Sequence, residues 1–265
     1  SVTDANPQVS GRGITLLREA GINVDVGLLS EQAYDLNLGF MKRMKTGLPW
    51  ITVKIAASLD GKTALSNGVS KWITGSAARA DVQKYRASHC ALITGVETIL
   101  VDDPSLNVRY EALGELTTRH TKDEIFQPLR VVLDSRARLT PIQQLFSIQS
   151  PILLVSGYDY PESTKAAFPD HVSFLQLTCD SSGRIPLLAL LTYLGQHINS
   201  VLVEAGATLA GAFVAQGLVD DIVLYQAPKL LGSHGRNMLQ LPNYSTMEQT
   251  PALQLIDERN VGQDK

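Results

Sequence analysis

Short apolar runs alternate with helical segments along the chain from Trp50 onward. The first run, WITVKIAAS (50–58), is apolar at nearly every position, so a strand there would be covered on both faces. A helical pattern follows in TGSAARADVQKYRASH (74–89), with Thr74 or Ser76 as its N-cap. Two-sided strands joined through helices are typical of a mostly parallel sheet with helices on both faces. We therefore predict an α/β fold.

The same alternation predicts the remaining elements of this part of the chain. Strands are expected at CALITG (90–95), LRVVLDS (129–135), SPILLVS (150–156), VSFLQLT (172–178), SVLVEAG (200–206) and DDIVLYQAP (220–228). Helices are expected at VETILVDD (96–103), IPLLALLTYLGQHI (185–198) and ATLAGAFVAQGL (207–218). The polar segment 111–127 reads as an irregular loop.

The first 49 residues read separately from the rest. VSGRGITLLREAG (9–21) predicts a short helix that ends at Gly21, and INVDVGLL (22–29) alternates like a strand. SEQAYDLNLGFMKRMKTG (30–47) predicts a second helix, capped by Ser30 and ended by Gly47-Leu48-Pro49. One strand and two helices cannot form a core alone, so this α/β fragment must pack on something else.

Composition excludes several classes of function. The 265 residues carry a net charge of −3 and a pI near 5.9, which disfavours nucleic acid binding and a polybasic membrane surface. Cys90 and Cys179 form no CxxC, and the five histidines show no metal-ligand spacing. No apolar run is long enough to span a bilayer, and the first residues do not form a secretion signal, so we expect a cytoplasmic protein.

Polar residues follow two of the predicted strands, where open α/β sheets bind ligands. After the first strand, Asp60-Gly61 is a strong turn signal, but a plain hairpin turn does not explain the long polar excursion that continues to Trp72. After SVLV (200–203), Glu204 is followed by a helix of small residues. Such a helix start lets a diphosphate approach the backbone N–H groups, although close helix–sheet packing would explain the small residues equally well.

Two further strand ends carry charge. Arg109 follows Pro104 on an extended segment and could hold a phosphate or carboxylate, or form a surface ion pair with Asp102 or Asp103. Ser135, with Arg136 and Arg138, suits the 2′-phosphate of NADP(H), or is simply a solvated basic turn. Together the four strand ends indicate an elongated ligand across the sheet edge, such as a dinucleotide with a second anionic partner.

These motifs carry a resemblance to a known family. KIAASLDGKTALSNGVSKWITG, LVDDPSLNVR, RVVLDS, VLVEAGATLAGAFVAQGLVDDIVLY and APKLLG resemble, in order and spacing, the reductase domain of the bacterial bifunctional riboflavin-biosynthesis enzymes of the RibD family. The resemblance covers most of residues 48–260. It implies a dihydrofolate-reductase-like fold, a homodimer, and NADPH-dependent reduction of the ribosyl group of 5-amino-6-(5-phosphoribosylamino)uracil to ribityl.

The resemblance also implies a domain division. Residues 1–47 resemble the end of the family's cytidine-deaminase-like domain, and residues 48–265 its reductase domain. The zinc-binding HAE and PCxxC motifs of the deaminase are absent, so this chain is not expected to bind zinc or to deaminate. The chain is expected to be incomplete, and its C-terminus stops where the family would add one more strand.

The family's site residues carry over onto matching positions here. Substrate contacts are expected at Ser70, Arg86, Leu106, Arg109 and Glu204. NADPH contacts are expected at Ala56, Trp72, Thr98, Asp102, Ser135 and Gly206, Ala207, Thr208, Leu209, Ala210, Gly211 and Ala212. Many relatives have a second glycine where this chain has Ala205, which still allows close approach.

Roles follow from these positions as hypotheses. Arg109 would anchor the substrate phosphate with Arg86 as a second cation, and Glu204 would accept hydrogen bonds from the pyrimidine or ribose. Trp72 would pack on the nicotinamide and exclude water, unless it is a core residue. The proton donor stays open among Asp102, Glu204, Lys54 and water.

Three alternatives compete with this interpretation. A dihydrofolate reductase-like enzyme with another substrate is disfavoured by DDPSLNVR, since dihydrofolate has no phosphate for an arginine to hold. A non-catalytic nucleotide-binding module is disfavoured by the intact set Ser70, Asp102, Arg109 and Glu204. A deaminase lacks its zinc ligands.

Overall fold

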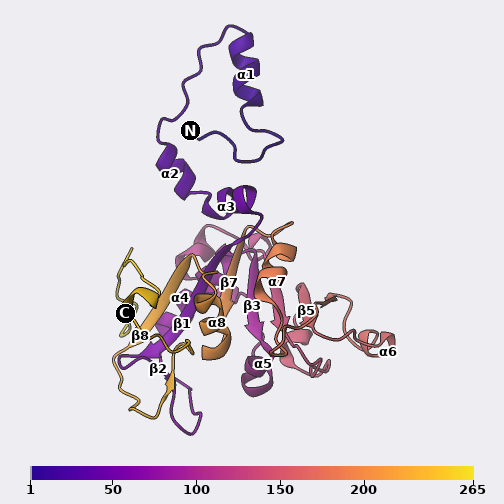
Figure 1. Cartoon of the computed structure of the whole chain (residues 1–265), viewed down its shortest axis with the longest axis vertical. Coiled ribbons are helices and arrows are strands. Elements are labelled where there is room, and N and C mark those ends of the chain that lie inside the picture. Colours follow the sequence, from indigo (N-terminus) through magenta and orange to yellow (C-terminus); the bar gives the residue numbers. More distant parts are fainter. Residues whose placement is uncertain (1) are drawn as a thin grey trace. The chain divides into compact units, whose positions relative to one another are not determined.

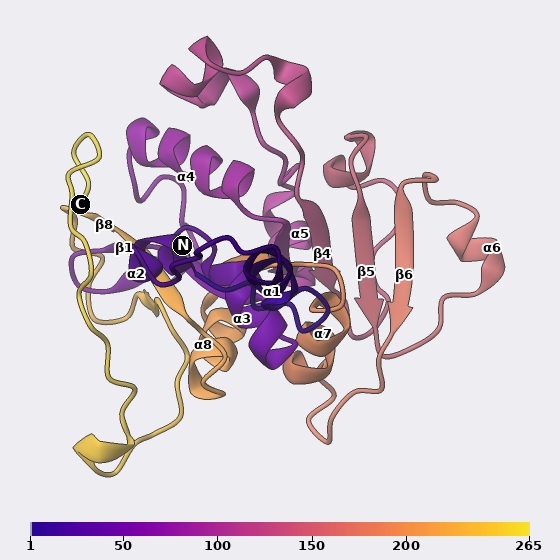
Figure 2. The ribbon, with the colours of Figure 1, turned by 90° about the horizontal axis from the view of Figure 1, so that it is seen from above.

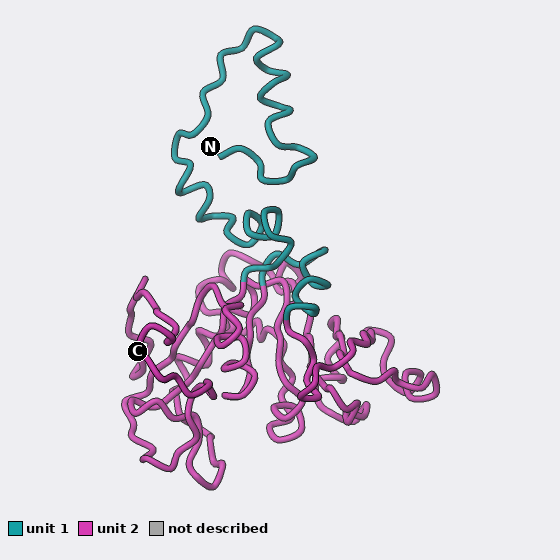
Figure 3. Tube along the Cα trace, viewed as in Figure 1, with its two compact units in different colours: residues 1–50, 188–200 teal, residues 51–187, 201–265 magenta. Residues whose placement is uncertain are grey.

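The computed structural model describes residues 2–265, and they form two compact units (Figures 1 and 3). The larger unit comprises Ile51–Leu187 and Val201–Lys265. The smaller unit comprises the residues up to Trp50 together with Leu188–Ser200. No helix in the described chain is both long enough and apolar enough to cross a bilayer.

A seven-stranded sheet forms the framework, with strand order β6-β5-β4-β3-β7-β1-β8. Its strands are β1 (Trp50–Ser58), β3 (Ala91–Gly95), β4 (Leu129–Leu133), β5 (Ile152–Ser156), β6 (Val172–Gln176), β7 (Ser200–Glu204) and β8 (Asp221–Ala227). The pairs β1–β8, β3–β7, β3–β4, β4–β5 and β5–β6 are all parallel. The predicted mostly parallel sheet is therefore confirmed, and each strand lies within the apolar run that predicted it.

Helices α4 (Ser76–Ser88) and α8 (Ala207–Ala215) cover opposite faces of this sheet (Figure 2). Ala78 and Val82 of α4 are four residues apart and so share one helix face, which packs on Tyr225 of β8. Helix α5 (Val96–Asp102) contributes Val96 and Ile99 to a hydrophobic core that includes residues of β3, β4 and β5. The chain after β1 also forms two short helices, α6 (Glu162–Lys165) and α7 (Leu187–Leu194), and a two-stranded antiparallel ribbon of β2 (Lys62–Ala64) and β9 (Arg236–Asn237).

The first residues are helical, without the strand that we expected. They form α1 (Arg12–Glu19), α2 (Ser30–Asp35) and α3 (Leu38–Thr46). The strand predicted at 22–29 is wrong: this segment is irregular, and its apolar side chains Ile22, Val26 and Leu28 are exposed. Alternation alone could not make a strand here, because none of the described residues of this unit offers a neighbouring strand for its backbone hydrogen bonds.

Helix ends followed the prediction only in part. Gly47 ends α3 with φ 74°, as expected for a left-handed C-cap. The helix predicted over 30–47 is split before Leu38, and Ser30 is its first residue rather than its cap. Neither Thr74 nor Ser76 caps α4: the cap is Gly75, whose N–H donates to the Asp264 carboxylate over 2.7 Å. Residues 110–124 contain only short 3₁₀ turns, in keeping with the predicted loop.

Candidate active site

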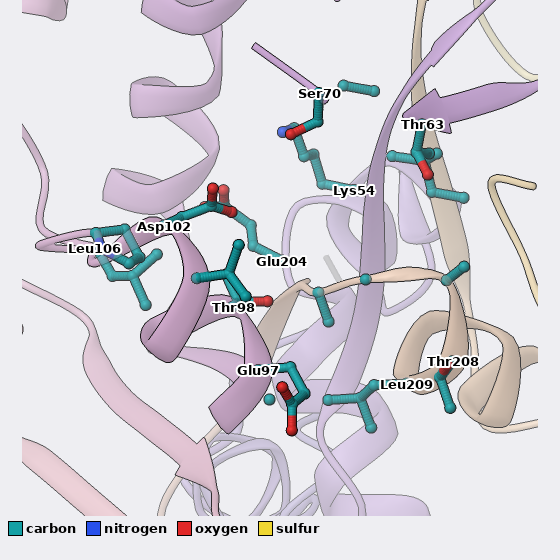
Figure 4. A pocket seen from close by; sticks show the side chains of 18 of the residues that line it. Lys54, Thr63, Ser70, Glu97, Thr98, Asp102, Leu106, Glu204, Thr208 and Leu209 are labelled. Carbon is teal, nitrogen blue, oxygen red and sulfur yellow. The ribbon is translucent and has the colours of Figure 1, made fainter. Parts of the chain in front are cut away.

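A cleft of about 1240 Å³ lies in the larger unit at the carboxyl ends of β1, β3, β4 and β7 (Figure 4). Sixteen of the eighteen residues that we expected at the site line it: Lys54, Ala56, Ser70, Trp72, Arg86, Thr98, Asp102, Leu106, Arg109, Ser135, Glu204, Gly206, Ala207, Thr208, Leu209 and Ala212. Ala210 and Gly211 do not line it. The parallel sheet brings the strand ends to one edge, which is why residues distant in sequence meet there.

A buried ion pair forms one wall of the cleft. Arg86 on α4 donates from Nε and Nη2 to the two carboxylate oxygens of Glu204 at the end of β7, over 2.6 and 3.0 Å. Its Nη1 donates to the Asn107 carbonyl over 2.9 Å, and both charged side chains are only 13% and 11% exposed. We expected Arg86 to be a second cation for the substrate phosphate, but in the structure two of its guanidinium nitrogens donate to Glu204 instead.

Lys54 lies beside this pair, on β1. Burial lowers the pKa of Lys54 below its ordinary value; the Glu204 carboxylate opposes this change and the Arg86 cation adds to it. Burial alone would raise the pKa of Glu204, but the charge of Arg86 and the hydrogen bonds from it hold that pKa below its usual range. The cleft therefore holds an ionised carboxylate next to an amine that gives up its proton more readily than an exposed lysine.

The segment after α5 forms a second wall. Asp102 ends α5 and lies 4.0 Å from the Lys71 ammonium, while Asp103 Oδ1 accepts a hydrogen bond from the Gln144 N–H. In the described part of the chain neither carboxylate forms an ion pair with Arg109. Asp103 and Leu106 both have positive φ, 43° and 53°, a strained conformation that places the buried Leu106 against the cleft. The Arg109 backbone N–H donates to Gln83 Oε1 over 3.0 Å, while its side chain makes no ion pair in the described part of the chain.

A residue that we did not anticipate supports this segment from behind. Arg130, on β4, is fully buried and donates to the carbonyls of Ser105, Leu145, Ile148 and Ser150 over 2.6 to 3.0 Å. Burial lowers the pKa of Arg130 to about 10. Because Ser105 precedes the strained Leu106, Arg130 fixes the cleft wall as well as the loop beyond it.

The polar excursion after β1 is an anchored loop and not a plain hairpin. Strand β2 pairs with β9 instead of β1. The Asp60 carboxylate accepts hydrogen bonds from Ser58 Oγ and from the N–H groups of Leu231 and Gly232, which lower the pKa of Asp60 to about 2. The loop thereby reaches the cleft fixed at its base, tied to the segment after β8.

Trp72, at the far end of this loop, is 64% exposed and lines the cleft, so it is not a core residue. The Arg79 guanidinium lies over its ring, 4.3 Å from the centroid, and Lys229 Nζ donates to its carbonyl over 2.8 Å. One face of the indole is thus held by a cation. An exposed aromatic ring in this setting is suited to packing against a planar ligand.

The start of α8 closes the cleft on the remaining side. Gly206 is its N-cap, and a Cβ placed there would meet nothing within 4 Å, so the backbone can be approached closely. Gly211, which does not line the cleft, has a packing constraint that we did not anticipate: a Cβ there would lie 2.2 Å from the Gln240 carbonyl oxygen. Gly211 serves helix–loop packing, and Ala210 is buried.

The basic turn after β4 is only partly available. Ser135 lines the cleft, but Arg136 and Arg138 do not. Arg138 is bound by Glu97 at 2.6 Å and lies 3.8 Å from Asp134. The cleft also has lining residues that we did not expect, among them Thr63, Arg184, Arg236 and Met238. Thr63 lies within the first quoted motif but was not singled out, whereas Arg184, Arg236 and Met238 lie outside all the quoted motifs, and only the fold brings them to this edge.

Comparison with known proteins assigns this arrangement to a family. The model of the RibD C-terminal domain matches residues 49–264. The chain belongs to the RibD family. RibD of Haemophilus influenzae and RibD of Escherichia coli are each 43% identical over 266 residues, which span 100% of this chain and 70% and 71% of those proteins.

Solved structures of RibD proteins have the same fold. Acinetobacter baumannii RibD (form 1) matches with a TM-score of 0.87 and 39% identity, over 99% of this chain and 69% of that one. A Thermotoga maritima deaminase/reductase matches with a TM-score of 0.80 and 27% identity over 99% and 68%. The Saccharomyces Rib7 reductase shares the fold at 18% identity, with a TM-score of 0.59 over 75% of this chain and 81% of that one.

Proposed function

We infer that this chain is a reductase of riboflavin biosynthesis that acts on 5-amino-6-(5-phosphoribosylamino)uracil. The observation that carries this function is the buried Arg86–Glu204 pair beside Lys54, in the cleft of a RibD-family reductase fold. Such a group of buried charges is costly to a fold and is typical of functional sites. No other function is favoured by a particular feature of the cleft.

We propose NADPH as the cofactor, and the cleft fits it in size and lining. An open cleft of about 1240 Å³ can take a dinucleotide and a second ligand together. The start of α8 would hold the diphosphate, Ser135 the adenosine end, and Ala56, Trp72, Thr98 and Asp102 the nicotinamide half. When bound, the dinucleotide supplies the hydride.

We propose that the substrate lies between Ser70, Leu106, Arg109 and Glu204. The Arg109 side chain, free of ion pairs in the described residues, would hold the 5-phosphate, while its backbone is fixed by Gln83. Arg86 would orient Glu204 rather than touch the phosphate. Glu204, kept ionised by Arg86, would then accept hydrogen bonds from ribose hydroxyls or pyrimidine N–H groups.

Reduction of ribosyl to ribityl adds a hydride at C1′ and a proton at the ring oxygen as the bond between them breaks. We propose Lys54 as the group that holds this proton, because its lowered pKa makes the ammonium a stronger acid than an exposed lysine. Asp102 and Glu204 remain as alternatives. Lys54→Met with unchanged turnover would remove Lys54 from consideration, and Asp102→Asn tests Asp102 in the same way.

The experiment that tests the function follows nicotinamide absorbance with the aminouracil ribosyl phosphate as substrate, and with NADPH and NADH in parallel. We expect oxidation of NADPH that depends on the substrate. Arg109→Ala should raise KM for the substrate far more than KM for NADPH, whereas Arg119→Ala, an exposed arginine outside the cleft, should change neither. Substrate-independent oxidation, or none, would refute the proposed activity.

Two broader features are also proposals. We propose a homodimer, which sedimentation of the purified chain would test. We propose that residues 1–47 are the end of a deaminase-like domain and that the chain does not itself deaminate, since its described residues contain no cluster of three or more metal-ligating side chains. Release of ammonia from the amino-pyrimidine precursor, inhibited by a chelator, would contradict this.

A further inference from the structure

Three arginines, Arg136, Arg138 and Arg184, lie in the segments near Ser135, where we propose that the adenosine of the cofactor binds. Only one of the three both lines the cleft and forms no ion pair in the described residues. Arg138 is bound to Glu97 and Asp134, and Arg136 does not line the cleft. Arg184 does line it and makes no ion pair within 4 Å in the described part of the chain. We propose that Arg184 recognises the 2′-phosphate of the dinucleotide and so determines preference for NADP(H) over NAD(H); this rests on the proposed function.

The fold places the Arg184 segment beside Ser135. Three consecutive strand ends lie side by side here: the Leu177 N–H donates to the Ser156 carbonyl over 2.9 Å, and the Gly157 N–H to the Ser135 carbonyl over 3.1 Å. A Cβ on Gly157 would lie 2.4 Å from Cys179 Sγ and 3.0 Å from the Ser135 carbonyl oxygen. The segment after β6 therefore passes within one residue's width of the turn after β4.

Arg184 is presented on a well-ordered turn rather than a loose loop. The Asp180 carboxylate accepts hydrogen bonds from the Ser182 N–H and hydroxyl and from the Arg184 N–H, over 2.6 to 3.1 Å. The Asp180 N–H donates back to the Arg184 carbonyl over 2.9 Å. Ile185 and Leu187, directly after the turn, are buried. The guanidinium thus starts from a fixed backbone, which limits the entropy lost when it binds an anion.

The charges around this end favour Arg184 as the phosphate ligand. Glu97 and Asp180 line the cleft here: Glu97 is paired with Arg138, and Asp180 accepts three hydrogen bonds within its own turn while its charge also attracts Arg184, so a phosphate must compete with Asp180 for this cation. A phosphate monoester brings close to two negative charges and three acceptor oxygens, which a planar guanidinium binds through two parallel hydrogen bonds. NAD(H) has a hydroxyl at this position and would gain little from Arg184.

The test measures binding of NADP⁺ and NAD⁺ to the full chain by calorimetry, with 2′-phospho-AMP and AMP as minimal probes. We expect R184Q to weaken NADP⁺ and 2′-phospho-AMP by about tenfold to hundredfold, with NAD⁺ and AMP unchanged, because a hydrogen bond to a charged group is lost. R184K should retain part of the preference. R119Q is the matched control and should bind like the parent chain.

Other outcomes separate this inference from the proposed function. An unchanged NADP⁺/NAD⁺ ratio in R184Q, or an equal loss of both dinucleotides, would overturn the role of Arg184 while leaving the reductase intact. A larger loss of the preference for NADP⁺ in R138Q or R136Q than in R184Q would show that the turn after β4 recognises the 2′-phosphate, and would also overturn the role of Arg184. A parent chain that binds neither dinucleotide would refute the proposed cofactor and this inference together.

Discussion

Breaking the Arg86–Glu204 pair should destabilise the fold more when one partner is removed than when both are. The pair is bidentate and almost fully buried. Removal of one partner leaves a buried charge uncompensated, which costs about 3–5 kcal/mol, whereas hydrophobic replacement of both is often close to neutral. We therefore expect a strong coupling between Arg86→Met and Glu204→Leu.

The neighbours of the pair predict an asymmetry between the single variants. Arg86→Met leaves Glu204 beside the Lys54 cation, which partly compensates it. Glu204→Leu leaves Arg86 and Lys54 as two buried cations without an anion, and only the Asn107 carbonyl still accepts a hydrogen bond from Arg86. Glu204→Leu should therefore approach the upper end of the 3–5 kcal/mol range, and Arg86→Met the lower end.

Urea unfolding of the parent chain, both single variants and the double variant completes a double-mutant cycle. We expect the double variant to lose at least about 2 kcal/mol less than the sum of the single losses. The pKa of Glu204 is lowered in the folded state, so the contribution of the pair is present above the unfolded pKa of a glutamate and is lost as pH falls through the folded value. Additive losses, or losses independent of acid pH, would refute the reasoning.

Three further predictions follow from single contacts. Lys54→Met should raise the urea midpoint at pH 7 while it abolishes turnover, and this gain should shrink as pH approaches 10, because a lowered lysine pKa makes the parent chain more stable as its ammonium deprotonates. Asp60→Asn should speed hydrogen exchange at the amides of Leu231 and Gly232, because an asparagine side chain has one acceptor oxygen where the Asp60 carboxylate has two. Unchanged exchange would contradict the role of Asp60 in anchoring the loop. Gly211→Ala should cost about 1–3 kcal/mol of unfolding free energy by forcing the backbone at Gln240 away, whereas Gly206→Ala, with open space at its Cβ, should cost little; equal losses would contradict the packing role.

The sheet could be predicted because its strands are apolar on both faces. A run such as WITVKIAAS has one plausible environment, a strand covered on both sides, and local sequence suffices to recognise it. The segment 22–29 shows the limit of the same reasoning. Its alternation is as regular as that of a strand, but a strand also needs a neighbour, and neighbours are a property of the fold rather than of the segment.

The partners within the site could not be predicted for a similar reason. Arg86 and Glu204 are 118 positions apart, and Asp60 and Leu231 are 171 apart. The motifs indicated that Arg86 and Glu204 belong at the cleft, but they did not indicate that the two side chains would form an ion pair with each other. Nothing in the sequence predicted the buried position of Arg130. A single cation in an apolar strand is easily taken for a residue at the exposed edge of the sheet, and only the structure shows its four carbonyl partners.

The distribution of buried charge favours the cleft, rather than the rest of the sheet, as the place of the proposed chemistry. A fold that needed only to be stable would place apolar residues at positions 54 and 204 of the sheet and at position 86 of α4, because paired buried ions contribute less than good hydrophobic packing and an unpaired one is a net cost. In β3 and β5 the buried positions are uncharged: β3 buries Ala91, Leu92, Ile93 and Thr94, and β5 buries Ile152, Leu153, Leu154, Val155 and Ser156. The three charges therefore mark where stability is given up, in keeping with the binding and proton-transfer roles that we propose for them. Arg130 belongs to a different category, since its hydrogen bonds go to backbone carbonyls and it does not line the cleft.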